Sequence, residues 1–408
     1  MSSQRLLASR RSTTQQHVVT SGRPHAVLLS GALLMALLLM LSGCHRTRSA
    51  QAVTAGDTIP LRYAQNLTMV RYSYGILVEL KDPWHEGRIL HRYWLTEDSN
   101  SNPSTILSPL SSLHSPLSSV RFPLQRSVVF NTAHASLIGM LNETDRIAGV
   151  ADLKYMLLPD VQRRVQQGEI VDCGNSMSPD IEQIVSLHAD AILLSPFENS
   201  GGYGRLEKLG IPIIECADYM ETSPLGRAEW MRFYGLLFGC SQQADSLFSM
   251  VERAYCALRD SVSTSAPLKI LTERLTGSTW YVPGGKSTMG RLIADAGATY
   301  AWADDDHSGS LALSFETVLS KSGNADVWLM NTSSPQPFTY ESLAAEHHGY
   351  TQFKAFRNRN IYFINTLQVP YFEEVSFRPD LLLRDYITML HPNPQHPPLR
   401  YFQKMHSQ

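Results

Sequence analysis

The chain has 408 residues, of which 43% are hydrophobic and 18% are charged, and its formal net charge is −2 at pH 7. This length and composition are ordinary for an α/β protein of two domains. Because the charge is slightly negative and no stripe of basic residues stands out, nucleic acid is not an expected partner. The cysteines after the first 44 residues fall in no CxxC or zinc-binding spacing, so no structural zinc site is expected.

The first 44 residues form a separate segment. It contains four arginines and no acidic residue, and it continues into the apolar run 26–41. This run is shorter than the roughly 20 residues of a membrane span, and it suits the hydrophobic region of a signal peptide. It ends in Leu41-Ser42-Gly43-Cys44, which resembles the lipobox of bacterial lipoproteins. We expect Cys44 to be lipidated and to become the mature N-terminus; an uncleaved anchor helix is the alternative.

Residues 45–125 are expected to contain a tether, a β-hairpin and a loop. The runs 70–80 and 89–95 are rich in β-branched and aromatic residues, and a turn with Pro83 and Gly87 separates them. This pattern predicts a hairpin, which we expect to cover an edge of the first lobe. Residues 99–119 are rich in Ser and Pro without any period, which predicts a loop.

Residues 126–240 alternate short apolar runs with helical stretches. Strands are predicted at 127–130, 147–150, 191–194 and 211–215, and the first helix is predicted at 135–141. Such alternation indicates a mostly parallel sheet with helices on both faces. We therefore interpret this region as one Rossmann-like lobe.

A long helix is predicted at 241–262, after a shorter helix that Gly239 ends. Apolar residues recur at helical spacing from Ala244 to Leu258. A helix of about 20 residues extends about 30 Å, which is long enough to connect two compact lobes. This helix is the element around which we expect the rest of the chain to be organised.

Residues 263–392 repeat the pattern of the first lobe. The stretches 178–194 and 313–330 are particularly alike, since each reads as a short helix with a glutamate, an Ala-Asp turn and a buried strand. The glutamates are Glu182 and Glu316. We predict two related α/β lobes with mostly parallel sheets, one rigid helix between them and a ligand cleft. The proline-rich tail, 393–408, is expected to be disordered.

Candidate ligand contacts follow the predicted strands, where open α/β sheets bind their ligands. Taken alone, each is more often a packing residue than a ligand contact; their shared place at strand ends of facing lobes brings the two interpretations level. No Ser-His-Asp order, paired carboxylates or dinucleotide glycine fingerprint stands out, and Asp304–Asp306 reads as a solvated loop. We therefore expect no catalytic residue, resident cofactor or metal site. The candidate contacts are His134, Asn175, Trp280, Tyr281, Tyr371, Phe372 and Arg378.

Several of these features together resemble one family. They are Leu41–Cys44, the strand and turn 128–134, the helices with Glu182 and Glu316, and the helix 241–262. The chain is similar, over about 126–392, to periplasmic substrate-binding proteins of the type that binds iron–siderophore complexes, haem and vitamin B12. The stretch 221–239 looks like the lipoprotein branch of that family.

The resemblance implies a lipid-anchored, monomeric protein of the cell envelope that delivers its ligand to the permease dimer of an ABC transporter. It also implies limited hinge motion, because one helix is stiffer than the connecting strands of other binding proteins. In the family, glutamates that match Glu182 and Glu316 stand at the lobe tips and meet arginines of the transporter. The candidate aromatic residues and Arg378 favour a metal chelate or corrinoid as ligand. A bare metal ion as ligand, and an enzyme on the same scaffold, remain open.

Overall fold

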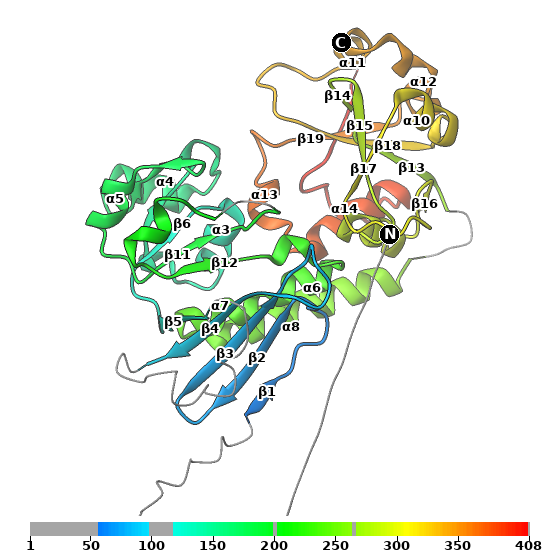
Figure 1. The fold of residues 1–408 in the computed structure, drawn as a ribbon. Helices are drawn as coiled ribbons and strands as arrows, with labels where there is room; N and C mark the ends of the chain where they lie inside the picture. Colours follow the sequence, from blue (N-terminus) through cyan, green and yellow to red (C-terminus); the bar gives the residue numbers. More distant parts are fainter. Residues whose placement is uncertain (1–55, 98–116, 199–201, 263–266, 407–408) are drawn as a thin grey trace, which may run out of the picture. The chain divides into compact units, whose positions relative to one another are not determined.

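The computed structural model describes residues 56–97, 117–198, 202–262 and 267–406 (Figure 1). The expected signal segment with Cys44 and most of the Ser/Pro-rich loop lie outside these residues. The described residues pack into one unit. Among the described helices, none combines the length and the apolar composition that a membrane span requires.

The N-terminal region forms a five-stranded sheet in the order β1-β2-β3-β4-β5. The expected hairpin is present as the antiparallel pair β3 and β4, but the run predicted as a single strand at 70–80 turns back between Tyr72 and Gly75. The sheet packs apolar side chains such as Met69, Val78 and Tyr93 into a core that also contains residues of α7 (Met231–Phe238). The strands are β1 (Asp57–Ile59), β2 (Leu67–Tyr72), β3 (Gly75–Lys81), β4 (Ile89–Thr96) and β5 (Leu117–Arg121).

Lobe 1 contains the predicted parallel sheet, in the order β12-β11-β6-β7-β8. The three strands β6, β7 and β11 are buried along their whole length, which explains why they read as continuous apolar runs. The strands are β6 (Ser127–Val129), β7 (Ile147–Val150), β8 (Val171–Asp172), β11 (Ala191–Leu194) and β12 (Ile213–Glu215), with the short pair β9 (Gly174–Asn175) and β10 (Ser178–Pro179). The helices are α3 (Thr132–Met140), α4 (Pro159–Gln166) and α5 (Ile181–Ser186), with 3-10 turns at Thr144–Arg146, Leu153–Tyr155, Leu206–Leu209 and Asp218–Met220.

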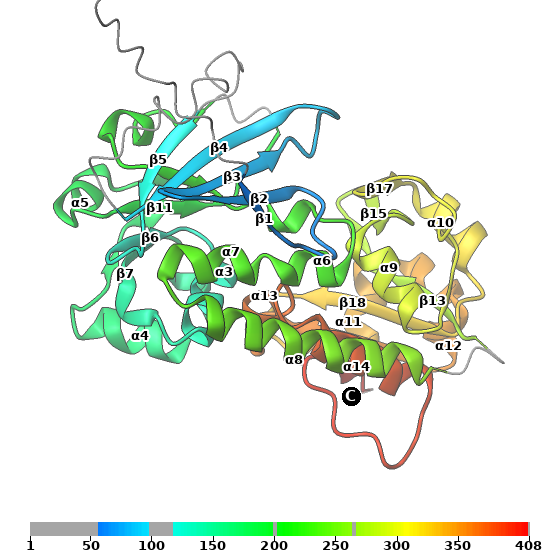
Figure 2. The ribbon, with the colours of Figure 1, turned by 90° about the horizontal axis from the view of Figure 1, so that it is seen from below.

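Three consecutive helices lead from lobe 1 to lobe 2: α6 (Pro224–Glu229), α7 (Met231–Phe238) and α8 (Ser241–Asp260). Gly239 ends α7 with a left-handed backbone, φ 72°. The helix α8 has 20 residues, as its periodicity predicted. Its residues Phe248 and Val251 belong to the core of lobe 1, whereas Tyr255 belongs to the core of lobe 2. Figure 2 shows α8 running beneath both lobes.

Lobe 2 has a sheet in the order β16-β13-β18-β19-β20, which is parallel except for β20. A three-stranded antiparallel sheet, β14-β15-β17, adjoins it. The strands are β13 (Lys269–Thr272), β14 (Leu275–Thr276), β15 (Thr279–Pro283), β16 (Thr299–Tyr300), β17 (Ser310–Leu313), β18 (Val327–Thr332), β19 (Ile361–Asn365) and β20 (Gln403–Lys404). The helices are α9 (Thr288–Asp295), α10 (Phe315–Ser322), α11 (Tyr340–Glu346), α12 (Lys354–Arg357), α13 (Tyr371–Glu374) and α14 (Pro379–Leu390), with a 3-10 turn at His348–Gln352.

The expectation that the C-terminal tail is disordered is wrong for its described part, 393–406. Its strand β20 pairs with β19, and Tyr401 and Phe402 are buried in the core of lobe 2. The backbone N–H groups of residues 400–402 donate to the carboxylate of Asp385 in α14. The burial of two aromatic side chains and the hydrogen bonds to one buried carboxylate therefore order this part of the tail despite its prolines.

Candidate functional site

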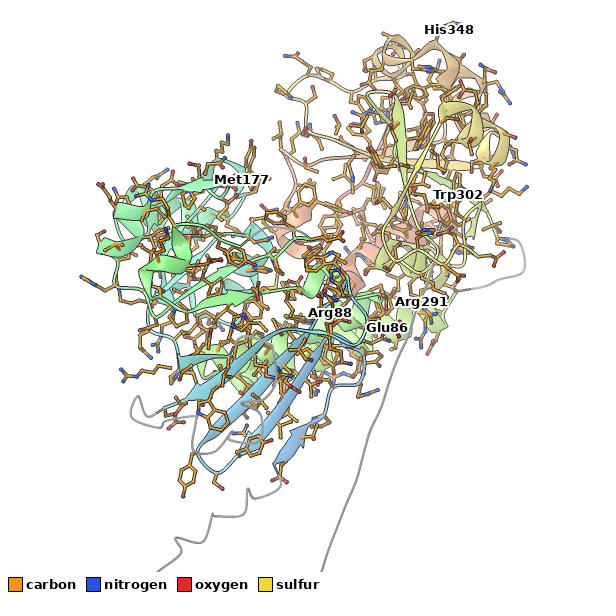
Figure 3. The ribbon with its side chains drawn as sticks, viewed as in Figure 1. Glu86, Arg88, Met177, Arg291, Trp302 and His348 are labelled. Carbon is orange, nitrogen blue, oxygen red and sulfur yellow. The ribbon has the colours of Figure 1, made fainter. Side chains whose placement is uncertain are left out.

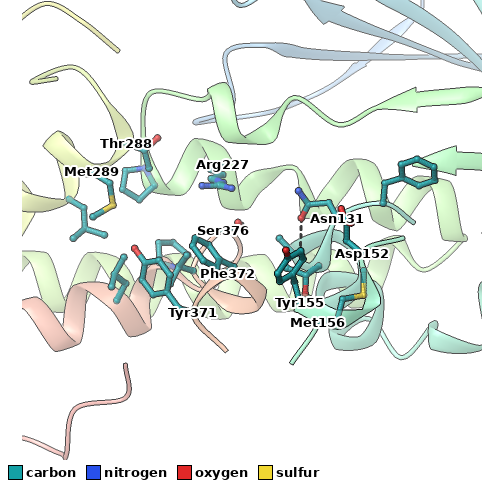
Figure 4. A pocket seen from close by; sticks show the side chains of 18 residues that line it. Asn131, Asp152, Tyr155, Met156, Arg227, Thr288, Met289, Tyr371, Phe372 and Ser376 are labelled. Atoms are coloured by element: carbon teal, nitrogen blue, oxygen red, sulfur yellow. Dashed lines mark hydrogen bonds between the residues drawn. The ribbon is translucent and has the colours of Figure 1, made fainter. Parts of the chain in front are cut away.

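A cavity of about 460 Å³ lies between the lobes (Figure 4). Lobe 1 contributes the segments that follow β6 and β7, lobe 2 contributes α9, α13 and the start of α14, and α6 contributes Arg227. The wall is therefore built at strand ends and helix starts, as an open α/β sheet requires. We call this space between the lobes the central cavity.

The lobe 1 wall is set by two turns that follow strands. Asn131 caps α3, because its side chain accepts the N–H of Ala133 at 2.8 Å, and its amide donates to Ser195 Oγ at 3.1 Å. Asp152 has a left-handed backbone, φ 55°, and accepts hydrogen bonds from Ser176. Tyr155 follows at 61% exposure; the ammonium of Lys154 lies over its ring, 4.6 Å from the centroid, and the rest of the ring is open to a ligand.

The lobe 2 wall is mainly apolar and carries two aromatic rings. After β19 the chain turns into α13, which begins with Tyr371 and Phe372. Phe372 is 54% exposed, whereas Tyr371 is 9% exposed and burial raises the pKa of its phenol. Figure 4 shows this pair on one side of the cavity, Tyr155 and Asp152 on the other, and Arg227 above Phe372.

Arg227 contributes a cation that a buried acid holds in place. Its Nε lies 3.2 Å from Oδ2 of Asp218, whose Oδ1 is 2.9 Å from Nε2 of His134. Burial opposes ionisation of Asp218, but the interactions with His134 and Arg227 outweigh it and hold the pKa of Asp218 below its ordinary value. The side chain of Arg227 is 26% exposed, so it can still meet an anionic group of a ligand.

Two further cavities extend the central one. The lobe 2 cavity, about 370 Å³, shares Tyr371 and Phe372 with it and adds Tyr281 and Glu273. Burial raises the pKa of Glu273, which accepts a hydrogen bond from Asn331 Nδ2 at 3.2 Å. The lobe 1 cavity, about 640 Å³, adds apolar residues such as Met177. Met177 is 77% exposed, and Figure 3 shows it on the side of lobe 1 that faces lobe 2.

The structure brings three of the seven expected contacts to these cavities, namely Tyr281, Tyr371 and Phe372. It corrects the expectation for Trp280, which is fully buried and stacks on Trp328 at 5.7 Å between ring centroids. Its Nε1 donates to the carbonyl of Thr272. Trp280 is therefore part of the aromatic core of lobe 2.

The three other expected contacts lie outside these three linings and stay predictions. His134 is 1% exposed and its Nε2 is hydrogen-bonded to Asp218, but it lines a further cavity of about 330 Å³ that shares Asn131 and Arg227 with the central one. Arg378 forms a two-pronged pair with Asp380, at 2.9 and 2.8 Å, and lines none of the three cavities described. Asn175 accepts the N–H of Met177 in the β9–β10 turn, outside the same three linings.

The sequence analysis missed Asp152, Tyr155, Arg227 and Glu273 as cavity residues. A usable signal existed for the first two, because the loop with Asp152 directly follows the predicted strand at 147–150. Arg227 and Glu273 had no comparable signal. Arg227 lies inside a helix, and its partner Asp218 is brought to it only by the fold.

The two glutamates expected to dock the transporter occupy equivalent places. Glu182 lies in the first turn of α5 and Glu316 in the first turn of α10, and both are exposed. The caps of these helices are other side chains, Asp180 and Ser314. Hydrogen bonds from its own backbone N–H and from Ser314 lower the pKa of Glu316, so it is ionised at neutral pH.

Comparisons with known proteins agree with this architecture. A heme-binding periplasmic protein of Pseudomonas aeruginosa has a TM-score of 0.53 and 16% identity, over 70% of this chain and 99% of its own. An Fe3+-hydroxamate transport system protein of Saccharomonospora viridis has a TM-score of 0.52 and 19% identity, over 65% of this chain and 92% of its own. At such identities the likeness shows the fold alone.

The sequence comparisons identify the family of the chain. An uncharacterized lipoprotein of Methanocaldococcus jannaschii, MJ0878, is 24% identical over 280 residues, and the match spans 66% of each chain. The family model for periplasmic binding proteins matches residues 128–366, which is more than half of the chain. Proteins of this family bind substrates for transport and are not enzymes, and their place is the cell envelope. This chain belongs to the periplasmic binding protein family.

Proposed function

We propose that this chain is a lipid-anchored substrate-binding protein that captures an organic metal chelate in the central cavity and delivers it to an ABC importer. The observation that carries the proposal is the wall of that cavity. Exposed aromatic rings line it from both lobes, Tyr155 from one and Phe372 from the other, and Arg227 lines the same cavity. A haem, a corrinoid and a ferric siderophore all belong to this ligand class.

The physical fit rests on two interactions. Aromatic rings that pack on a flat macrocycle or on catechol rings add about 0.5–1.5 kcal/mol each beyond the burial of apolar area. A guanidinium forms charge-assisted hydrogen bonds with carboxylate, catecholate or hydroxamate oxygens. The names of the similar structures, a heme-binding protein and an Fe3+-hydroxamate transport protein, support the same class.

A bare metal ion is the second candidate. A transition-metal ion would need several convergent imidazoles and carboxylates. Within the described part of the chain, no group of three or more His, Cys, Asp and Glu side chains could hold a metal ion. The imidazole of His134 is already hydrogen-bonded to Asp218. These observations favour the chelate.

Titration of the purified protein tests the ligand class. We expect haem, cobalamin or a ferric trihydroxamate to quench tryptophan fluorescence saturably, at micromolar concentration or below. Binding of free Zn²⁺ or Mn²⁺, without a response to any of the three chelates, would overturn the proposal in favour of a bare ion.

We also propose that Cys44 carries the lipid. The support is the sequence Leu41-Ser42-Gly43-Cys44 after an apolar run, and the similarity to a protein named as a lipoprotein. Replacing Cys44 by Ser should release the protein from the membrane fraction. Retention of the variant through a carbonate wash would show that another segment is the anchor.

A further inference from the structure

Residues 61–66, which precede β2, make an unusual set of hydrogen bonds. Five consecutive backbone N–H groups, from Arg62 to Asn66, donate to only two carboxylates. Glu229 accepts from the first three at 2.7–2.9 Å, and Glu221 accepts from the last two at 2.9 and 3.0 Å. The segment is therefore held along its whole backbone rather than at one point.

Both carboxylates are buried, which makes the arrangement rigid. Glu229 is fully buried and Glu221 is 3% exposed. Glu221 also accepts the indole N–H of Trp230 at 2.9 Å. A buried carboxylate is costly unless donors surround it, so neither glutamate can leave these N–H groups without a large penalty.

Glu221 precedes α6 and Glu229 is the last residue of α6, the helix that passes from one lobe to the other. Leu225 of α6 belongs to the core of lobe 2, whereas Ala228 belongs to the core of lobe 1. The carbonyl of Glu221 also accepts the hydroxyl of Thr288, the first residue of α9 in lobe 2. The segment 61–66 is thus attached to the chain at the place where α6 crosses between the lobes.

The same segment holds the second crossing helix, α8. The hydroxyl of Tyr63 donates to Glu252 at 2.6 Å, and Arg62 lies 2.9 Å from the same carboxylate. Glu252 follows Val251, in the core of lobe 1, and precedes Tyr255, in the core of lobe 2. The ring of Tyr63 itself packs against both cores.

We propose that residues 61–66 are an inter-lobe brace, which ties α6 to α8 where both helices cross between the lobes and thereby limits how far the central cavity can open. In a hinge motion, a few loop or element-terminal residues absorb the change of backbone angles, and Glu221 and Glu229 stand at the two ends of α6. Tying the two helices together at that point removes the freedom of each to bend alone. The brace lies before the part matched by the family model, which begins at residue 128.

The test measures the distance between the lobes and needs no ligand. Spin labels are placed at Ser186→Cys on α5 and Ser320→Cys on α10, two exposed sites. Cys44→Ser and Cys256→Ser remove the lipidation site and the one described cysteine that is not buried.

The brace variant is Tyr63→Phe with Glu252→Gln. The matched control is Tyr203→Phe, whose hydroxyl makes the same kind of bond, 2.6 Å to Glu215, inside lobe 1.

We expect the width of the distance distribution to increase at least twofold in the brace variant and to stay unchanged in the control. A merely structural role would lower the melting temperature of both variants and leave the width unchanged. Because Thr132 and Glu373 also join the lobes, the measurement is repeated with Thr132→Val. Unchanged widths in both backgrounds would overturn the brace, whereas the proposed ligand class would stand.

Discussion

Thr132, the first residue of α3 in lobe 1, donates its hydroxyl hydrogen to Oε1 of Glu373 in α13 of lobe 2, at 3.0 Å. The same oxygen accepts the N–H of Leu157, also in lobe 1, at 2.9 Å. Glu373 is 2% exposed. One buried carboxylate therefore ties the lobes together beside the central cavity, which is lined by Thr132 and by Phe372, the residue before Glu373.

Removing the hydroxyl should weaken this tie. Thr132→Val keeps the shape of the side chain but leaves the carboxylate of Glu373 with one donor fewer, and such a loss costs about 1–3 kcal/mol. We expect the free energy of unfolding in urea to fall by that amount. Thr351→Val is the control, because its hydroxyl donates to His348 within lobe 2. Equal losses of unfolding free energy in both variants would show that this hydrogen bond between the lobes stabilises the protein no more than one within a lobe.

Ligand affinity should depend on the exposed rings of the central cavity. Phe372→Ala or Tyr155→Ala removes a surface that a flat chelate would cover, and burial of one aromatic side chain is worth about 1.5–3 kcal/mol. We expect the dissociation constant for the bound chelate to rise at least tenfold in a fluorescence titration. Tyr74→Ala is matched in chemistry and is 66% exposed, but it lies in the β2–β3 turn. It should leave affinity unchanged; an equal loss in Tyr74→Ala would argue against the site.

The pair of Asp218 and Arg227 should make stability depend on pH. Because the folded-state pKa of Asp218 is lowered, its contribution is complete above the unfolded pKa, about 3.9, and is lost as the pH falls through the folded value. Asp218→Asn should therefore destabilise the protein at pH 7, and its difference from the wild type should shrink below about pH 4. Urea unfolding across this range measures the effect.

Asp160→Asn is the control for this experiment. Hydrogen bonds from Arg163 and Arg164 lower the pKa of Asp160 as well, but this carboxylate is on the surface. Water screens such a pair, and exposed pairs are worth about 0–1 kcal/mol. A loss at pH 7 as large as that of Asp218→Asn would contradict the view that burial makes the inner pair strong.

Much of the fold was predictable because periodicity and burial agree locally. The apolar spacing from Ala244 to Leu258 predicted α8, and the strands of lobe 1 read as apolar runs because both their faces are covered. The rule that ligands meet strand ends placed Tyr371 and Phe372 correctly in a cavity wall. These features depend on neighbours in the sequence, so the sequence alone displays them.

The errors concern which way a side chain points and which partner the fold supplies. Trp280 and Tyr281 are neighbours in β15, and successive residues of a strand face opposite sides. Trp280 is therefore buried and Tyr281 is 48% exposed, a distinction that needs the position of the core. Arg378 pairs with Asp380 at the start of α14. Arg227 lies in the wall of the cavity, where the fold brings Asp218 within hydrogen-bond distance of it. Such pairings between side chains produce no periodic pattern in the sequence.

Glu182 and Glu316 are expected to dock the two lobes onto the permease. They lie in equivalent first turns of α5 and α10, exposed, while Asp180 and Ser314 cap these helices. A carboxylate in a first turn is also favoured by the helix dipole, by about 0.3–1 kcal/mol, and this is the competing explanation. A two-lobed protein that meets a two-fold permease needs one such charge on each lobe, which the duplicated pair supplies.

Exposed charge pairs govern orientation and encounter more than affinity. Glu182→Ala and Glu316→Ala should therefore leave folding and chelate affinity nearly unchanged, while uptake of the chelate by cells falls, and falls further in the double variant. Glu86→Ala is the matched control, because Glu86 (labelled in Figure 3) is equally exposed but lies between β3 and β4 of the N-terminal sheet. Uptake and chelate binding are measured for the same four variants. Normal uptake in the double variant would show that the two glutamates only stabilise their helices; a parallel loss of chelate affinity would show that they act through the fold rather than at the transporter.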